Sequence, residues 1–187
     1  MIRHSFIFGL AVTALCGLVP SHAMGQEAAS KEASIITNSD SAVADAEAEV
    51  EKARMAIEKG KQLIVSIPED SPLMSEVASV LEAASDNWKI AIDSLKGAKV
   101  SASKIATASS DEIANDYALL AKVNAGVAHS GAKVVQIALL YIEAVAEDKT
   151  ETLPVMRTSL QDALASSSQV QFNYERVKKI IAQKYSK

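Results

Sequence analysis

The sequence predicts an all-α protein, an up-down-up-down antiparallel four-helix bundle with long helices, preceded by a cleaved signal peptide and a short flexible tether. Three observations support this prediction. Apolar and small residues recur at alternating spacings of three and four, the pattern of helices packed along a seam. Pro68, Pro72 and Pro154 stand where that pattern is interrupted. The chain also opens with a short apolar run behind a basic residue.

Residues 1–25 have the layout of a secretory signal peptide. Arg3 precedes an apolar run over residues 6–19, which is shorter than the ~20 residues of a membrane span. The small residues of AMG predict cleavage near Gly25/Gln26, with cleavage after Ala23 or an uncleaved anchor as alternatives. We therefore expect a periplasmic or secreted bacterial protein with no transmembrane segment after signal removal.

Composition excludes several classes of function. The single cysteine, Cys16, lies in the expected leader, and beyond it only His129 remains of the three histidines. Disulfides and sites built from cysteine or several histidines are therefore not expected, and we expect no cofactor. The net charge of −4 and the aromatic content of 4% argue against a nucleic-acid partner, because such proteins carry a basic excess and stacking aromatics.

The polar stretch 26–39 has no helical period and is expected to be a flexible tether, whereas residues 40–187 form the bundle. The first helix is expected over residues 40–67. Its seam is Val43, Ala46, Val50, Ala53, Ile57, Gly60, Ile64 and Ile67. It ends at Pro68, because proline disfavours helix in the residue before it. Ser71 followed by Pro72 predicts the start of the next helix.

The second helix is expected over residues 72–108. Its seam is Met74, Val77, Leu81, Ala84, Trp88, Ala91, Leu95, Ala98, Ala102 and Ile105. The phase slips in TASSDE, which predicts a turn there. Ser109 or Ser110 is then the N-cap of a third helix, with Asp111 and Glu112 at its positive end. The alternative is one bent helix that continues through this segment.

The third helix is expected over residues 111–148, and it carries two adjacent seams. One is Ile113, Tyr117, Leu120, Asn124, Val127, Gly131, Val134, Ala138, Tyr141 and Val145; the other is Ala114, Ala118, Ala121, Ala125, Ala128, Ala132, Val135, Leu139, Ile142 and Ala146. Two seams imply two or more partners, so this helix should be the most buried.

The fourth helix is expected over residues 154–185, starting at Pro154. Its single seam is Met156, Leu160, Ala163, Ser167, Val170, Tyr174, Val177 and Ile181. The short connections between the helices predict that consecutive helices run antiparallel.

The stretch GVAHSGAKV has two glycines and a lysine, as a phosphate-binding loop does. The hydroxyl residue that should follow the lysine is absent, and both seams of the third helix pass through the stretch, so its N–H groups are used within a helix. Antiparallel register instead predicts a core layer of Val50, Trp88, Gly131 and Val170, in which the glycine makes room for the indole. A cavity for a small apolar ligand at this level is the alternative.

Catalytic chemistry has little support in the sequence. His129 lies off both seams, in the row Lys122, His129, Lys133, Gln136 and Glu143, and no nucleophile motif or metal-ligating pattern accompanies it. The acidic residues at positions 45, 47, 49 and 51 are interpreted as a solvated face. Asn124 is the polar residue on a seam, and it predicts either an interhelical hydrogen bond that fixes register or a ligand contact.

The C-terminal segment is a basic patch and the most distinctive surface in the sequence. Its residues are Arg176, Lys178, Lys179, Lys184 and Lys187. Cations near a helix C-terminus complement the helix dipole, and they also suit an anionic partner. We expect a non-enzymatic structural or protein-interaction module of the bacterial envelope, whose partner is an unknown protein or an anionic envelope component. Self-association stays open, and a carrier of a small apolar ligand is the alternative.

Overall fold

The computed structural model describes residues 24–186, and burial is described from residue 38 onward. The described chain is helical, and no strand occurs in it. Its elements are α1 (Met24–Ile64), α2 (Met74–Ile105), α3 (Asp111–Ala146), the 3₁₀ turn η1 (Thr150–Thr152) and α4 (Leu153–Lys184). The four predicted helices are therefore present. Nearly all of the expected signal peptide lies outside the described residues.

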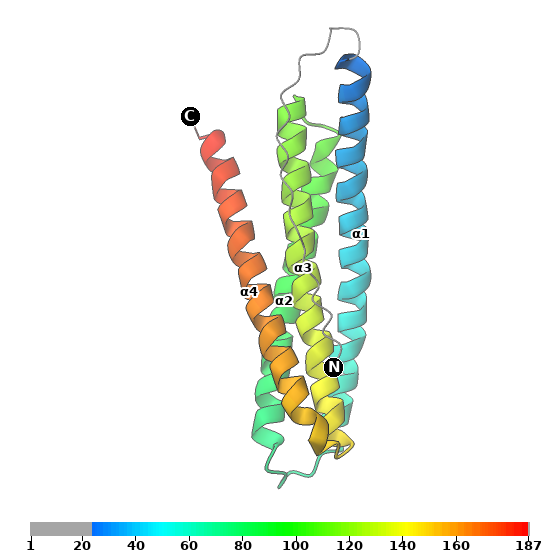
Figure 1. Ribbon diagram of the computed structural model, residues 1–187, viewed down its shortest axis with the longest axis vertical. Coiled ribbons are helices and arrows are strands. Elements are labelled where there is room, and N and C mark those ends of the chain that lie inside the picture. The colour runs from blue at the N-terminus through cyan, green and yellow to red at the C-terminus, as the bar shows by residue number, and fades with distance from the viewer. Residues whose placement is uncertain (1–23, 187) are drawn as a thin grey trace, which may run out of the picture.

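Consecutive helices alternate in direction, and α3 lies at the centre of the arrangement (Figure 1). It packs against α1, α2 and α4, and α1 also packs against α2; within residues 24–186, the backbone of α4 packs against α3 and makes no close approach to that of α1 or α2. The helices thus form a three-helix core with α4 laid along one flank, which differs from a bundle closed by contact between its first and last helices. The physical reason lies in the seams, since α3 carries two and can serve three neighbours whereas α4 carries one.

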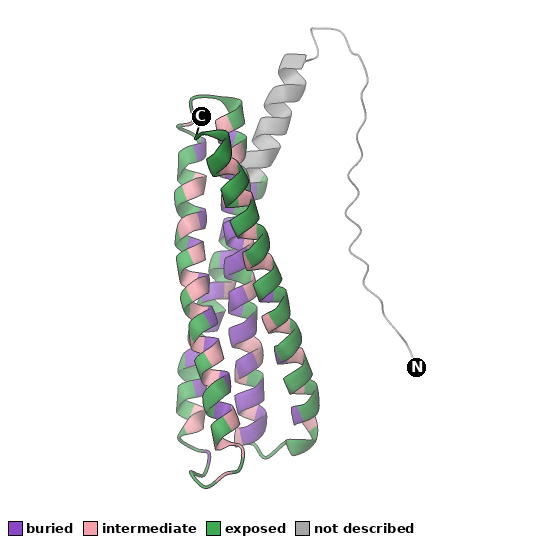
Figure 2. Ribbon diagram, turned by 90° about the vertical axis from the view of Figure 1, so that its left-hand side faces the viewer, coloured by how far each residue is buried: buried purple, intermediate pink, exposed green. Residues whose placement is uncertain are grey.

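The seams predicted from the sequence coincide with the packed faces of the helices. Every seam residue of all four helices is buried or half-buried, and the buried positions follow the inner faces of the ribbons (Figure 2). Sixteen residues of α3 are buried, against eight in α2 and three in α4. The expectation that the third helix is the most buried is confirmed.

The ends of α3 follow local chemistry. Ser110 is the N-cap, and its hydroxyl accepts a hydrogen bond from the backbone N–H of Ile113 at 3.4 Å. The predicted turn is confirmed, and the alternative of a single bent helix is wrong. At the other end Asp148 has φ of 54°, and the N–H groups of Asp148 and Lys149 donate to the carbonyls of Val145 and Ala144 at 3.2 and 2.8 Å. This is a Schellman ending.

Two predicted boundaries differ from the structure. Because α1 begins at Met24, the first helix starts before the predicted residue 40 and includes residues 26–39, whose Ala, Glu and Lys residues are good helix formers. The flexibility expected of this stretch stays a prediction. In addition, α2 begins at Met74 rather than at Pro72, and its N-cap is Leu73. The Ser71 hydroxyl accepts from the N–H of Leu73 at 3.3 Å, so it stabilises the turn before the helix instead of capping it.

By length and composition, α3 could cross a membrane, and it is the one helix of the described chain that meets this test. In the structure 56% of its most apolar window is buried inside the protein. The core helix of a bundle has the same composition, so this finding is weak evidence for a membrane span.

The predicted core layer is arranged differently from our expectation. Val50 and Gly131 are buried, whereas Trp88 and Val170 are half-buried. A Cβ added at Gly131 would lie 2.8 Å from the backbone carbonyl oxygen of Asn87 and 3.2 Å from Cβ of Ala91. The glycine therefore accommodates the backbone of α2 rather than the indole. Val170 faces a different glycine, with its Cγ1 3.8 Å from the Cβ position of Gly126.

The two glycines of α3 provide a matched pair of substitutions. Gly131→Ala forces a Cβ against the Asn87 carbonyl, whereas Gly126→Ala makes only an ordinary contact with Val170. Both variants gain about 1 kcal/mol of helix propensity, so the difference between them reports the close approach of α2 and α3. We expect Gly131→Ala to be less stable than Gly126→Ala by about 1–3 kcal/mol. Urea unfolding of both variants measures this, and equal stabilities would show that the helices separate at little cost.

Candidate functional site

Helix α4 is attached to the core by its apolar seam and, at three levels, by polar side chains. Its buried residues are Leu153, Leu160 and Ser167, all of them in the first half of the helix. Hydrogen bonds and ion pairs to α2 and α3 supplement this small apolar contact. The hollows of the described surface lie beside α3, next to α1 on one side and next to α4 on the other. We place the candidate sites there.

The first attachment is an ion pair over a buried tyrosine. The Arg157 guanidinium donates to both carboxylate oxygens of Glu76 on α2, at 2.6 and 2.7 Å. This bidentate contact holds the pKa of Glu76 below its usual value. Tyr141 of α3 lies beside the pair with 0% of its surface exposed, and its hydroxyl has no hydrogen bond of normal geometry within the described chain. Burial, followed by the neighbouring Glu76 carboxylate, raises the pKa of Tyr141 to about 12.

The second attachment is a short chain of hydrogen bonds between α2 and α4. The Ser167 hydroxyl donates to Oδ1 of Asn87 at 3.2 Å, and Nε2 of Gln171 donates to the Ser167 hydroxyl at 3.2 Å. Nδ2 of Asn87 donates to the carbonyl of Ala83 at 3.0 Å. Both Asn87 and Ser167 are buried, so this polar layer fixes the register of α4 on the core.

The third attachment joins the C-terminal end of α4 to the start of α3. Lys184 pairs with Glu112 and Asp116, each at 2.7 Å, and the Tyr185 hydroxyl donates to Asp116 at 2.6 Å. Burial alone would raise the pKa of Asp116, but the hydrogen bonds from Lys184 and Tyr185 outweigh it and lower the pKa.

The predicted basic patch is consequently divided. Lys184 is engaged in this clamp, and Lys178 pairs with Glu175 at 3.5 Å while lying over the ring of Tyr174. Arg176 and Lys179 are exposed, with no ion pair to any residue of the described chain. Lys187 lies outside the described residues.

The opposite flank of α3, against α1, is hollowed and not covered by α4. Nε2 of Gln136 donates to Glu49 at 2.8 Å, and Lys59 pairs with Glu143 across the two helices. Hydrogen bonds from Lys52 and Gln136 lower the pKa of Glu49 to about 2. Beside these bridges is a hollow of ≈ 360 Å³ lined by Lys52, Met55, Ala56, Lys59, Gln136, Leu139 and Leu140.

Large apolar side chains remain exposed along this α1/α3 flank. Met55 is 52% exposed, Leu140 is 50% exposed and Leu119 is 43% exposed. Leu119 lines a second hollow between the same two helices, of ≈ 250 Å³, together with Asn38, Ser39, Asn115, Ala118 and Lys122. Two separate hollows with exposed apolar side chains, each with lysine in its lining, therefore lie along the α1/α3 flank.

Asn124 does not form the interhelical hydrogen bond that its seam position predicted. Its side chain is buried, with 5% of the residue exposed, and it lies over Gly97 of α2. It opens on a hollow between α2 and α4 that Tyr174 also lines. Among the residues that line this hollow, Asn124 is the one that the sequence pattern singled out, as a polar residue on an apolar seam.

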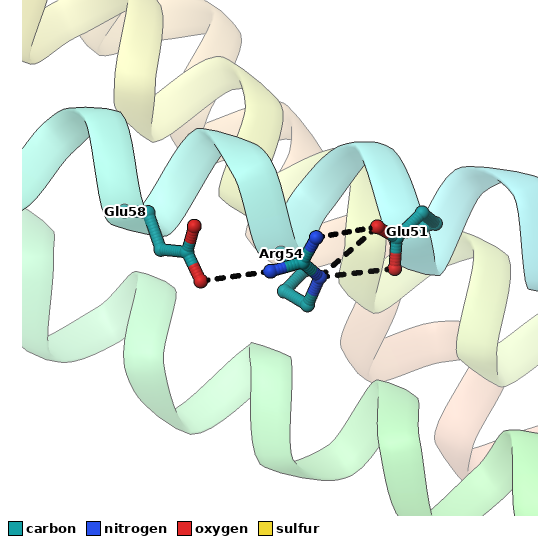
Figure 3. Close-up of polar contacts among 3 residues, drawn as sticks. All are labelled: Glu51, Arg54 and Glu58. Carbon is teal, nitrogen blue, oxygen red and sulfur yellow. Dashed lines mark hydrogen bonds and ion pairs between the residues drawn. The ribbon is translucent and has the colours of Figure 1, made fainter.

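The acidic residues of α1 pair mostly with bases on their own helix. Arg54 lies between Glu51 and Glu58 (Figure 3), with contacts of 2.7 and 2.9 Å. Hydrogen bonding to Arg54 lowers the pKa of Glu51. All three side chains are exposed, in keeping with a solvated face.

His129 is exposed on α3. No group of three or more histidine, cysteine or acidic residues in the described chain is placed to hold a metal ion. The arrangement of the described side chains is therefore that of a surface with grooves between helices.

No protein-family model, curated protein or solved structure matches this chain. Function is therefore argued from the geometry of these flanks.

Tyr141 provides a pH test of the first attachment. Its folded pKa of about 12 lies above the ordinary value of 10.0, so the protonated phenol contributes stability that is complete below pH 10 and is lost as the pH rises towards 12. We expect Tyr141→Phe to abolish an alkaline loss of up to about 2 kcal/mol. At neutral pH the variant should differ by less than about 1 kcal/mol, because the hydroxyl has no well-formed hydrogen bond to lose.

Urea unfolding of both proteins at neutral pH and between pH 10 and 12 measures this difference. Other groups that titrate in alkali are common to the two proteins and cancel in the comparison. Parallel alkaline losses would mean that Tyr141 ionises freely and that the Glu76 contact does not constrain it.

Proposed function

We propose that this chain is an exported, non-enzymatic helical-bundle protein that acts as a structural or protein-interaction module in the bacterial envelope. The observation that carries the proposal is the uncovered α1/α3 flank. On this flank the side chains of Met55, Leu119 and Leu140 are exposed, because α4 packs elsewhere on α3 and does not cover them. Exposed apolar side chains rimmed by polar residues are typical of interaction sites.

The partner that fits this flank is an amphipathic helix whose apolar stripe meets the exposed apolar side chains and which carries a carboxylate near Lys122. Leu119 and Leu140 are roughly 30 Å apart along α3, at 1.5 Å per residue, which suits a helix of about twenty residues lying in the groove. Lys52, Lys59 and Lys122 line the two hollows. Lys52 and Lys59 already pair with Glu49 and Glu143, so a carboxylate on the partner would complement Lys122.

The side chains of the described surface support a non-enzymatic role. His129 is exposed, and no carboxylate or nucleophile contacts it through a described hydrogen bond. Glu47, Glu49, Glu51 and Glu58 of α1 are held in salt bridges. General acid–base catalysis would require a titrating group positioned against a substrate in a pocket.

A second candidate, a carrier of a small apolar ligand, is favoured by one observation. Between α3 and α4 lies a hollow of ≈ 260 Å³ lined by Ile113, Asp116, Tyr117, Leu120, Ile181, Ala182 and Tyr185. Its walls are mainly apolar, but the volume is below the ~300–1,000 Å³ usual for ligand sites. We therefore rank it second. Leu120→Trp would fill the hollow, and an unchanged retention of co-purified apolar molecules by that variant would exclude this site.

The interaction proposal is tested by replacing apolar residues of the flank. A photo-crosslinking side chain at position 140, used in intact cells, identifies the partner; the purified partner is then titrated against the chain. We expect the double variant Met55→Lys, Leu140→Lys to weaken binding at least about tenfold, as for buried contacts at the centre of an interface. Val100, which is 54% exposed on α2, provides the control, and Val100→Lys should leave binding unchanged.

Three outcomes would contradict the proposal. Cross-linking that is equally strong from positions 100 and 140 would mean that the flank is not selective. Unchanged affinity of the double variant would mean that another surface binds the partner. A cross-linked adduct of two copies of this chain would mean that the flank mediates self-association and does not bind a partner helix.

A further inference from the structure

The outward face of α4 combines exposed apolar side chains with cations that the fold does not use. Phe172 is 60% exposed and Ile180 is 61% exposed. Arg176 and Lys179 are exposed as well, with no ion pair to any residue of the described chain. At 3.6 residues per turn, these four side chains fall within about 100° of the helix circumference. The half-buried seam of α4 lies on the opposite side of the helix, so this face points away from the bundle (Figure 2).

Positive charge dominates this end of α4. Between residues 163 and 186, Glu175 is the single acid, and it pairs with Lys178 at 3.5 Å. The α3 acids in contact with this end of α4 are bound in the clamp made by Lys184. The two outward cations therefore keep their charge for a partner outside the bundle.

The face is a ridge at the edge of the molecule. Helix α4 lies across the bundle from α1 (Figure 1), and none of its described residues after Ser167 is buried. Phe172 and Ile180 are two turns apart, roughly 12 Å along the helix axis, with Arg176 between them. A flat surface can meet all three side chains at once.

The order of these side chains favours a lipid surface over a protein partner. Protein interfaces place apolar residues at the centre and polar residues at the rim, and lysine is depleted from them. In α4 the cations instead lie between the two apolar side chains along the helix. A bilayer suits this order, because apolar side chains can enter the acyl boundary while the stems of arginine and lysine extend back to the phosphates.

We propose that the outward face of α4, made of Phe172, Arg176, Lys179 and Ile180, docks on an anionic phospholipid surface. The two apolar side chains enter the boundary between headgroups and acyl chains, and the two cations pair with lipid phosphates. So few contacts give weak, reversible and salt-dependent binding. Because the face lies across the bundle from the α1/α3 flank, this inference is independent of the function proposed above.

The test places an indole on the face of the full chain, as Phe172→Trp. The vesicles contain equal parts of phosphatidylglycerol and phosphatidylcholine, with bromine on the acyl chains, because bromine there quenches an indole that enters the hydrocarbon. We expect these vesicles to quench the introduced indole saturably, and brominated vesicles of phosphatidylcholine alone to quench it only weakly. Trp88 is the single native tryptophan and adds the same background to every variant.

Removal of the cations tests the electrostatic part of the proposal. Added to Phe172→Trp, the pair Arg176→Gln and Lys179→Gln should raise the half-saturating lipid concentration about thirtyfold, from about fivefold for each cation. The matched control, Lys52→Gln with Lys59→Gln, changes the net charge equally on the α1/α3 flank. It should change this concentration less than about twofold at physiological salt, because distant charges are screened. Circular dichroism verifies that both variants fold.

Leu140→Trp reports on the α1/α3 flank and should show no quenching above the parent chain. The proposal is overturned if the indole at position 172 is not quenched, if the indole at position 140 is quenched equally, or if removal of the two cations leaves the lipid dependence unchanged. A response at position 172 to polyglutamate but not to vesicles would also overturn it, and would assign the face to an acidic protein surface. Loss of partner cross-linking from position 140 contradicts the proposed function alone, so the two failures are distinguishable.

Discussion

The close packing of α3 is the constraint on which the rest of the structure depends. Its buried face is built largely from alanine, with Gly131 where the backbone of α2 comes nearest. Small side chains let α1 and α2 approach α3 closely, and they do so on two adjacent seams. Because α1 and α2 occupy most of these two seams, α3 offers less apolar surface to its third partner, α4, which buries only three residues. The flanks of α3 stay open because α3 is already satisfied by its two nearest neighbours.

The sequence allowed the helices and their inner faces to be predicted well, because the period of apolar residues records which face each helix buries. The turn at Ser110 was predicted for the same reason, since a change of phase has no other simple cause. The sequence pattern predicted that Gly131 faces Trp88. In the structure, the atoms nearest to the Cβ position of Gly131 belong to Asn87 and Ala91. A seam gives the level of a residue along the bundle but not the rotation of each helix about its axis. A helix rotated by one residue position presents a backbone carbonyl to its neighbour where a side chain was expected.

The candidate sites could be predicted less completely than the fold. Asn124 was recognised because it is polar on an apolar seam, and Lys184 because it belongs to a basic segment. Neither signal exists for Arg157, Glu76 or Asp116, whose roles depend on which helices meet and at what height. The packing of α4 against α3, with polar side chains that reach α2, is equally invisible to periodicity. A single seam indicates that α4 has a partner but not which groove it occupies. The open α1/α3 flank follows from that choice and could not be anticipated.

Polar attachment gives α4 a different character from the other helices. Apolar burial is non-directional and scales with area, so α1, α2 and α3 are held along their whole contact. The hydrogen bonds of Ser167 and the ion pairs of Arg157 and Lys184 act at separate points, and exposed pairs contribute little net stability because water competes for both partners. Between these points the helices need not touch, and the hollow beside Asn124 is one such interval. A fourth helix held in part by spaced polar contacts therefore leaves grooves that a fully apolar seam would have closed.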